Sequence, residues 1–209
     1  MVDVYIVGED DVTKEIIKKI IVYCGIDKIN IIGSLPARGG QIKHQINNYN
    51  KLASSNPVIL LMDLDANNCP PQLIQKLHIN EKSDKFILNI AIDEAEAWLM
   101  ADRKNFASYF QVDISTIPQS QLTRLNGPKS VIEMDFPIKS SLYLNTCIIP
   151  TSRSEKIRAQ MIPEKNACKG KEYNSAVLPF IRDRWDIVNA MENSDSLKRM
   201  VHRIQTLIA

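Results

Sequence analysis

Hydrophobic residues in the first half of the chain occur in short continuous runs, and the segments between them have the one-sided spacing of amphipathic helices. Continuous apolar runs are typical of strands buried on both faces, and their alternation with helices indicates a mainly parallel sheet covered on both sides. The expected strands are 2–8, 28–32, 58–62 and 86–92, and the expected helices are 12–24, 41–52, 70–77 and 93–102. The pattern therefore predicts a three-layer α/β core over residues 1–105.

The second half of the chain has a different pattern, in which prolines divide the sequence into short pieces. These prolines are Pro118, Pro128, Pro137 and Pro150. Helical spacing of apolar residues returns at 152–161, 173–191 and 194–207. We therefore expect residues 106–209 to form a loop-rich and helical extension that packs on the core.

Composition and charge are those of an ordinary globular protein. The 209 residues are 44% hydrophobic and 24% charged, and the formal net charge of +2 is too small to indicate nucleic-acid binding by itself. No apolar run approaches the roughly 18 to 20 residues of a membrane-spanning helix, so we expect a cytoplasmic protein with no membrane partner. The segment from Thr151 onward has eleven Lys or Arg and seven Asp or Glu, a small basic surplus.

The four cysteines are widely separated and form no Cys-x-x-Cys pair. They are Cys24, Cys69, Cys147 and Cys168. This spacing indicates neither a zinc cluster nor a disulfide framework, so we expect reduced, structural cysteines.

Acidic residues follow two of the predicted strands. Glu9, Asp10 and Asp11 come after the first strand, and Asp63 and Asp65 close the third. Ligands of open parallel sheets bind at the carboxyl ends of the strands, and a strand order of 2-1-3-4 would place the first and third strands about 4.8 Å apart. Glu9 would then face Asp63 and Asp65. Carboxylates this close repel each other unless a cation neutralises them, and oxygen ligands favour Mg²⁺ and phosphate chemistry.

The same residues also have purely structural interpretations. Asp10 or Asp11 would cap the first helix, because acidic side chains are favoured at helix amino termini. Asp63 and Asp65 would be solvated turn residues, since aspartate is common in turns. The sequence leaves both interpretations open.

A third acidic group, Asp93, Glu94 and Glu96, follows the fourth strand and opens at the same edge of the sheet. Asp93 and Glu96 have the spacing of a capping box, which would account for both without a ligand. Glu94 has no such capping role, and the alternative to a ligand role for Glu94 is a solvated surface residue.

Three segments of the first half resemble the TOPRIM fold, a Rossmann-like arrangement shared by topoisomerases, primases and the nucleases of the OLD (overcoming lysogenization defect) type. These segments are 7–11, 62–65 and 91–102. More narrowly, the chain looks like a small bacterial TOPRIM-like family, to which three parts of the tail are also similar. Those parts are Lys171 to Asn174, Trp185 and Ser194 to Leu197.

The resemblance implies roles for individual residues. In TOPRIM proteins a glutamate after the first strand acts in acid/base work or helps to hold metal, and an Asp-x-Asp pair binds Mg²⁺; Glu9, Asp63 and Asp65 match these positions. The usual glutamate-glycine order appears here as Gly8-Glu9, so Asp11 is a second candidate for the glutamate's role.

The activity that the resemblance implies is Mg²⁺- or Mn²⁺-dependent hydrolysis of DNA or RNA, with the protein as the effector of a defence or toxin-like system. Asp63 and Asp65 would hold the metal, Glu9 or Glu94 would orient water, and a second ion would use Glu96. The resemblance also implies a separate ATPase as a possible partner, since such family members often work beside one. The chain has no phosphate-binding loop of the Gly-x-x-x-x-Gly-Lys-Ser/Thr type, so any nucleotide-driven control would have to come from that partner. Two alternatives stay open, a non-catalytic adaptor and a phosphatase or phosphotransferase for small substrates.

Basic residues would contact the nucleic-acid backbone. The candidates are Arg38, Lys165, Lys169, Lys171, Arg182 and Arg184. Exposed lysines in a solvated loop are the simpler interpretation of the residues around Gly170. Trp98 and Trp185 could stack on bases, but their helical positions beside apolar neighbours favour the core.

Overall fold

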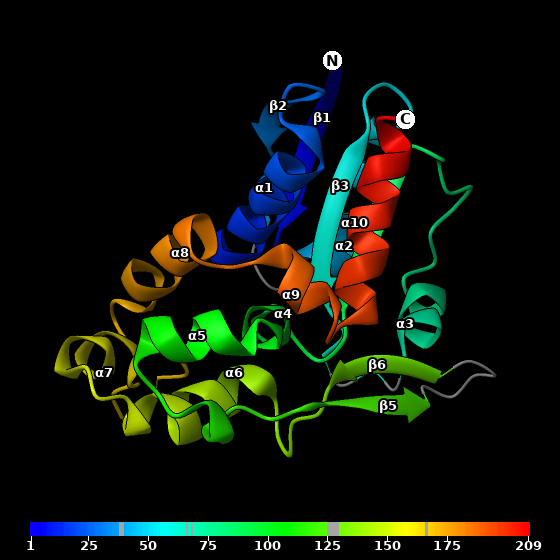
Figure 1. The fold of residues 1–209 in the computed structure, drawn as a ribbon. Helices are drawn as coiled ribbons and strands as arrows, with labels where there is room; N and C mark the ends of the chain where they lie inside the picture. Colours follow the sequence, from blue (N-terminus) through cyan, green and yellow to red (C-terminus); the bar gives the residue numbers. More distant parts are fainter. Residues whose placement is uncertain (38–39, 66, 68, 125–129, 166) are drawn as a thin grey trace. The chain divides into compact units, whose positions relative to one another are not determined.

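The computed structural model describes residues 1–37, 40–65, 67, 69–124, 130–165 and 167–209 (Figure 1). The chain divides into two compact units. The first unit contains residues 1–92 together with 196–209, and the second contains residues 93–195. The end of the chain therefore belongs to the same unit as its beginning.

A four-stranded parallel sheet forms the centre of the first unit. Its strands are β1 (Val2–Gly8), β2 (Ile29–Ser34), β3 (Val58–Asp63) and β4 (Phe86–Ala91), in the order β2-β1-β3-β4. Every residue of β3 before Asp63 is buried, and so is every residue of β4. The predicted α/β class is confirmed, and the strand order is the 2-1-3-4 order that was assumed for the meeting of the acidic groups.

Helices cover both faces of this sheet. They are α1 (Asp11–Gly25), α2 (Gln41–Leu52), α3 (Pro70–Lys76) and α10 (Asp195–Leu207). In Figure 1, α1 and α10 lie in front of the sheet and α2 lies behind it. The chain crosses the sheet in one direction from β1 to β2 and in the other from β2 to β3, so right-handed crossovers place α1 and α2 on opposite faces. The inward side of α1 is apolar at the helical spacing, with Ile16, Ile17, Ile20 and Ile21 buried. The result is the expected three-layer arrangement.

The second unit is mainly helical. Its helices are α4 (Ala95–Ala101), α5 (Arg103–Phe110), α6 (Ser140–Tyr143), α7 (Glu155–Met161), α8 (Tyr173–Asp183) and α9 (Ile187–Met191), with short helical turns η1 (Ile114–Thr116), η2 (Leu144–Ile148) and η3 (Ile149–Thr151). It also contains an antiparallel pair, β5 (Ser120–Arg124) and β6 (Ser130–Met134), in a stretch where the sequence pattern predicts only loops.

Two predicted helices of this unit differ from the structure. The helix predicted at 93–102 begins only at Ala95, because Asp93 has a φ of 68°, a left-handed conformation that no α-helix contains. The helix predicted at 173–191 is broken, because the Asp186 carboxylate accepts the N–H groups of Val188 and Asn189 and so starts a separate helix, α9.

The core of the second unit is built around its two tryptophans. Trp98 and Trp185 are 0% and 2% exposed, and the Trp185 indole donates a hydrogen bond to the Trp98 carbonyl oxygen at 3.2 Å. Phe106, Phe110 and Phe180 form an aromatic cluster in the same unit. The prediction that both tryptophans are core residues is confirmed, and stacking on bases by these rings is excluded by their burial.

Candidate metal site at the carboxyl edge of the sheet

Parallel pairing of β1 with β3 brings the first two acidic groups together. Gly8 is paired with Leu61, so the residue after Gly8 lies level with the end of β3. The Glu9 carboxylate accepts a hydrogen bond from the Asp63 backbone N–H at 3.3 Å. The predicted approach of Glu9 to the Asp-x-Asp pair is therefore present in the first unit.

Burial makes the Glu9 carboxyl a weaker acid than usual. Desolvation raises its pKa above 4.5, and the nearby negative charges of Asp65 and Asp10 raise the pKa further. The hydrogen bond from the Asp63 N–H and the positive charge of Lys43 act in the opposite direction, but the pKa stays raised. Glu9 is thus a carboxyl group whose proton affinity is increased at the edge of the sheet where ligands bind.

Asp65 lies in a strained turn and is paired with a lysine. Its φ is 53°, a left-handed conformation that aspartate tolerates better than most residues. The Lys43 ammonium of α2 lies 3.0 Å from Asp65 Oδ2, and the two side chains are 37% and 35% exposed. An ion pair this exposed contributes only about 0–1 kcal/mol, so a metal ion or an anion could separate the two groups at small cost.

The structure also tests the capping interpretation of the first acidic cluster. Asp10 precedes α1, and its carboxylate accepts the Thr13 N–H at 2.9 Å while its own N–H donates to the Thr13 hydroxyl at 3.0 Å. The capping role of Asp10 is confirmed. Asp11 is exposed in the first turn of α1, and its role in holding metal stays a prediction.

The donor set suits one kind of metal site. Within the described residues, no group of three or more His, Cys, Asp or Glu side chains is arranged to hold an ion by itself. Mg²⁺, however, is usually held by one or two carboxylates, with waters and substrate phosphates completing its shell. Asp63 and Asp65 supply the two carboxylates that such an open site would use, and their role in holding a metal stays a prediction.

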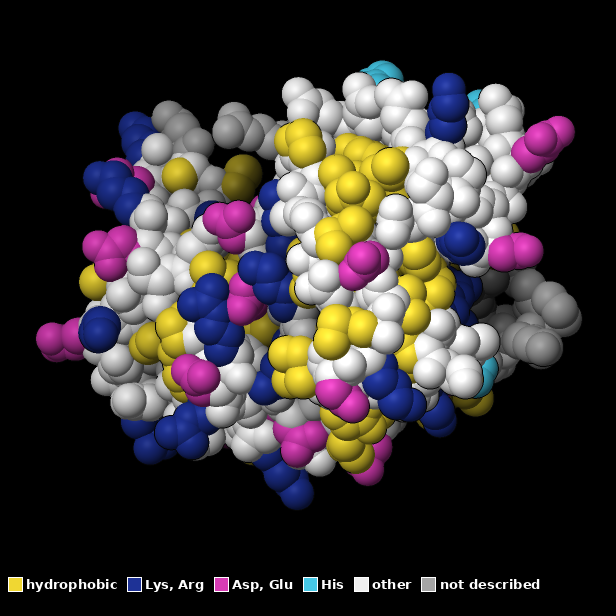
Figure 2. Space-filling model, turned by 90° about the horizontal axis from the view of Figure 1, so that it is seen from above, with side chains coloured by type: hydrophobic (Ala, Val, Ile, Leu, Met, Phe, Trp, Pro, Cys, Tyr) yellow, Lys and Arg dark blue, Asp and Glu magenta, His cyan; other side chains and the backbone are white. Residues whose placement is uncertain are grey.

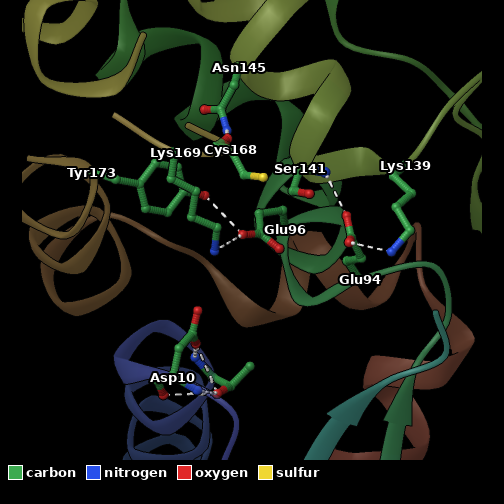
Figure 3. A network of polar contacts seen from close by, with 10 residues as sticks. Asp10, Glu94, Glu96, Lys139, Ser141, Asn145, Cys168, Lys169 and Tyr173 are labelled. Carbon is green, nitrogen blue, oxygen red and sulfur yellow. Dashed lines mark hydrogen bonds and ion pairs between the residues drawn. The ribbon is translucent and has the colours of Figure 1, made fainter. Parts of the chain in front are cut away.

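The acidic residues after β4 belong to the second unit and are held there by lysine side chains, backbone N–H groups and the Tyr173 hydroxyl (Figure 3). Glu96 is 4% exposed, and its Oε1 accepts the Tyr173 hydroxyl at 3.0 Å and lies 2.9 Å from the Lys169 ammonium. Glu94 accepts the Ser141 N–H at 2.9 Å and lies 3.4 Å from the Lys139 ammonium. Two lysines therefore balance the two buried carboxylates.

The capping box proposed for Asp93 and Glu96 is wrong. Helix α4 starts after Glu94 without a side-chain cap, and the Asp93 carboxylate instead accepts the Ser140 N–H at 2.9 Å. Burial and the neighbouring Glu94 charge raise the Asp93 pKa, while hydrogen bonds from Ser140 lower it in part. The solvated-surface interpretation of Glu94 is also wrong, because Glu94 is 8% exposed.

The predicted nucleic-acid-binding residues have different surroundings. Lys169 pairs with Glu96 and lies 4.7 Å from the centre of the Tyr173 ring, and Lys171 pairs with Glu164 at 2.8 Å. The side chains exposed at the surface of the second unit include Lys165, Arg182 and Arg184. Arg38 lies outside the described residues.

Lys43 is the site residue that the sequence analysis missed. It lies in the first turn of α2, which follows the carboxyl end of β2. The rule that places ligands at the carboxyl edge of a parallel sheet applies to this position as well, so the sequence contained a signal for Lys43 as a site residue.

Comparisons with protein-family models, with curated proteins and with solved structures found no match.

Among the described helices, none has the length and apolar character needed to cross a membrane.

Proposed function

We propose that the protein is a Mg²⁺- or Mn²⁺-dependent nuclease of the TOPRIM-like class, which hydrolyses phosphodiester bonds of DNA or RNA. One observation carries the proposal: Glu9 and Asp63 meet at the carboxyl ends of neighbouring parallel strands, where the Asp63 N–H donates to the Glu9 carboxylate. This edge is where open α/β sheets bind ligands. Asp65 adds a further carboxylate within electrostatic reach of Glu9.

Each residue has a chemical task in this proposal. Asp63 and Asp65 hold the ion, and when bound the ion supplies charge neutralisation of the phosphate and a more acidic water. Glu9 accepts the proton of the attacking water, a role to which its raised pKa is suited because the proton affinity of a general base should approach the working pH. Lys43, once separated from Asp65, neutralises a phosphate oxygen.

Charge on the second unit supports a polymeric substrate. Lys165, Arg182 and Arg184 are exposed there and would contact the backbone of a nucleic acid without reading its sequence. On the face drawn in Figure 2, however, basic and acidic side chains are interspersed. We therefore expect the protein alone to bind nucleic acid weakly and with strong dependence on salt. In our proposal the protein is the effector of a defence or toxin-like system, and a separate ATPase partner helps it to bind its target.

The test uses plasmid DNA, linear DNA and structured RNA, each with Mg²⁺, Mn²⁺ or chelator. Wild-type protein is compared with Asp63→Asn and Asp65→Asn, and Asp27→Asn serves as the matched control because Asp27 is exposed near the start of β2, at the opposite edge of the sheet. Cleavage should require metal and should fall more than roughly 100-fold in both site variants, since even groups that only support metal ligands are worth 10–100-fold. Equal cleavage by wild type and both site variants would refute the proposed metal site.

A binding measurement separates the alternatives. Mn²⁺ should raise the unfolding temperature of the wild type and of Asp27→Asn but not of Asp65→Asn. The Lys43–Asp65 ion pair specifically favours a non-catalytic adaptor, in which the lysine permanently takes the place of a metal. That function is supported if neither Mn²⁺ binding nor cleavage occurs, whereas metal binding with hydrolysis of small phosphate esters alone supports a phosphatase.

A further inference from the structure

A cavity that is not part of the candidate metal site lies in the first unit, beside the first half of β4. The structure contains an open cavity of about 490 Å³ there, within the 300–1,000 Å³ range of small-molecule sites. Its lining includes Ile74, Lys82, Asp84, Phe86, Leu88, Arg203 and Leu207. The strand β4 is an edge strand, and α10 brings Arg203 to it from the end of the chain.

The cavity is separate from the carboxylates at the other end of the sheet. In the β3–β4 register Phe86 is paired with Val58, and Ala91 is paired with Asp63. Phe86 is five residues before Ala91, about 16 Å along the strand, and Leu88, the strand residue of the lining nearest to Ala91, is three residues before it, about 10 Å. A ligand in the cavity would therefore not touch the candidate metal site.

Two cationic residues, Lys82 and Arg203, line the cavity together with one carboxylate, Asp84, and both cationic residues are exposed. Neither Lys82 nor Arg203 forms an ion pair with any part of the chain that the structure describes. Burial lowers the pKa of both groups, and the charge of Arg203 lowers the pKa of Lys82 further. Asp84 opposes this effect at Lys82, but it lies beyond ion-pair distance. Like charges held beside partly desolvated walls are stabilised by an anion between them.

The geometry of Arg203 indicates the shape of that anion. Its Nη1 donates to the Leu88 carbonyl oxygen at 2.7 Å and to Asn89 Oδ1 at 3.2 Å, which fixes the guanidinium plane against the edge of β4. A guanidinium has five N–H donors in a planar fork, so the edge formed by Nε–H and Nη2–H remains for a ligand. Such an edge matches two oxygens of a carboxylate or a phosphate.

The walls of the cavity indicate what the anion is attached to. The apolar floor of the cavity that a ligand can cover comes mainly from Ile74, which is 41% exposed, and from the half-buried Leu207, because Phe86 and Leu88 are already only 0% and 6% exposed. A free inorganic ion would leave this apolar surface in water. A ligand with an apolar body would cover it and gain roughly 25 cal/mol for each Å² removed from water.

We infer that the cavity beside β4 binds a small amphipathic oxyanion, a carboxylate or phosphate monoester with an apolar body, which Arg203 holds through two hydrogen bonds and Lys82 through charge. A structural role for Arg203, as a donor to the Leu88 carbonyl oxygen of the edge strand and to Asn89, accounts for Nη1 alone. It accounts neither for the second cation nor for the apolar floor.

The probes for the test are hexanoate and hexyl phosphate, with acetate, inorganic phosphate and hexanol for comparison. Binding is measured by titration calorimetry and by the movement of the Leu88 and Thr206 amide signals in nuclear magnetic resonance spectra. Both amphipathic anions should bind saturably and at least about tenfold more tightly than acetate, phosphate or hexanol. The stronger of the two identifies the oxyanion.

Two variants and one control connect this binding to the cavity. Arg203→Gln and Lys82→Gln should each weaken binding by roughly tenfold or more, because a hydrogen bond to a charged group contributes about 1.5–3 kcal/mol. Lys82 makes no side-chain hydrogen bond with the residues that the structure describes, so its variant tests binding even if Arg203→Gln unfolds. Lys198→Gln removes the same charge from an exposed position of α10 outside the cavity and should bind normally.

Several results would overturn the inference. It fails if neither amphipathic anion moves the Leu88 signal, or if Lys82→Gln and Lys198→Gln bind the probes equally well. It also fails if inorganic phosphate binds as tightly as hexyl phosphate, because the apolar floor would then contribute nothing. None of these outcomes depends on nuclease activity.

Discussion

Replacement of Gly8 by alanine should destabilise the protein through a clash at the start of α1. A Cβ at position 8 would lie 2.6 Å from the Thr13 hydroxyl oxygen and 2.9 Å from the Lys14 backbone nitrogen. The hydroxyl belongs to the capping box that starts α1, so it cannot move without loss of its bonds to Asp10. The close approach of α1 to the end of β1 therefore requires a glycine immediately before Glu9.

The size of the effect follows from two contributions. Loss of the Thr13 cap costs about 1 kcal/mol. Overpacking against the backbone of Lys14 costs a further 1–3 kcal/mol or so. We expect Gly8→Ala to lower the free energy of unfolding by about 2–4 kcal/mol. Gly40 is the matched control, because a Cβ there meets nothing within 4 Å and its φ is −58°, so Gly40→Ala should be neutral or stabilising by up to about 1 kcal/mol.

The assay is urea unfolding followed by far-ultraviolet circular dichroism for wild type, Gly8→Ala, Gly40→Ala, Thr13→Ala and the double variant Gly8→Ala/Thr13→Ala. Removal of the Thr13 hydroxyl takes away the closer contact, so the cost of Gly8→Ala should fall by about 1 kcal/mol in the Thr13→Ala background. The reasoning is refuted if Gly8→Ala stays within about 0.5 kcal/mol of wild type, or if its cost is unchanged when Thr13 is alanine.

Three further predictions concern other parts of the chain. Gly170→Ala should destabilise the second unit by at least about 3 kcal/mol, because its Cβ would meet the backbone of Gln160 and lie 2.6 Å from the Met161 carbonyl carbon; a urea unfolding curve like that of wild type would contradict this. Because the folded state raises the Glu9 pKa above 4.5, it binds that proton more tightly than the unfolded state does, so the contribution of Glu9 to stability is present at low pH and declines as pH rises through the folded pKa. Glu9→Gln should therefore gain stability relative to wild type as pH rises across that window, and a constant difference between the two unfolding free energies would show that the carboxyl is not perturbed. Burial raises the Cys24 pKa to about 11, so iodoacetamide at mildly alkaline pH should label the exposed Cys147 and Cys168 well before Cys24, and mass spectrometry that finds equal rates would refute the assigned burial.

The strands of the first unit could be predicted because their signal is local. Each is a continuous apolar run, and a parallel sheet covered on both faces is the arrangement that buries such runs. The meeting of Glu9 with Asp63 could be predicted for a related reason. Both residues follow strand ends, and parallel strands end at the same edge, so only the order of the strands had to be assumed.

The second unit was harder to predict because its structure depends on particular side chains rather than on periodicity. Asp186 starts a new helix by binding two backbone N–H groups, and Asp93 is turned into a left-handed conformation beside Ser140. The spacing of apolar residues is the same with or without these contacts. A helical pattern at 173–191 therefore concealed the break between α8 and α9.

The sequence by itself determined the strands of the first unit and most of its amphipathic helices, and it limited the cap of α1 to Asp10 or Asp11, because each depends on residues within one or two turns of chain. Only the tertiary structure decided which distant groups meet. Lys43 reaches Asp65, Lys169 and Tyr173 reach Glu96, and Arg203 reaches Leu88 across 115 residues of chain. No local pattern specifies such partners, because the packing of whole elements, driven by burial of their apolar faces, decides which charged groups lie close together. A charged group that this packing buries is stable only where a partner lies beside it.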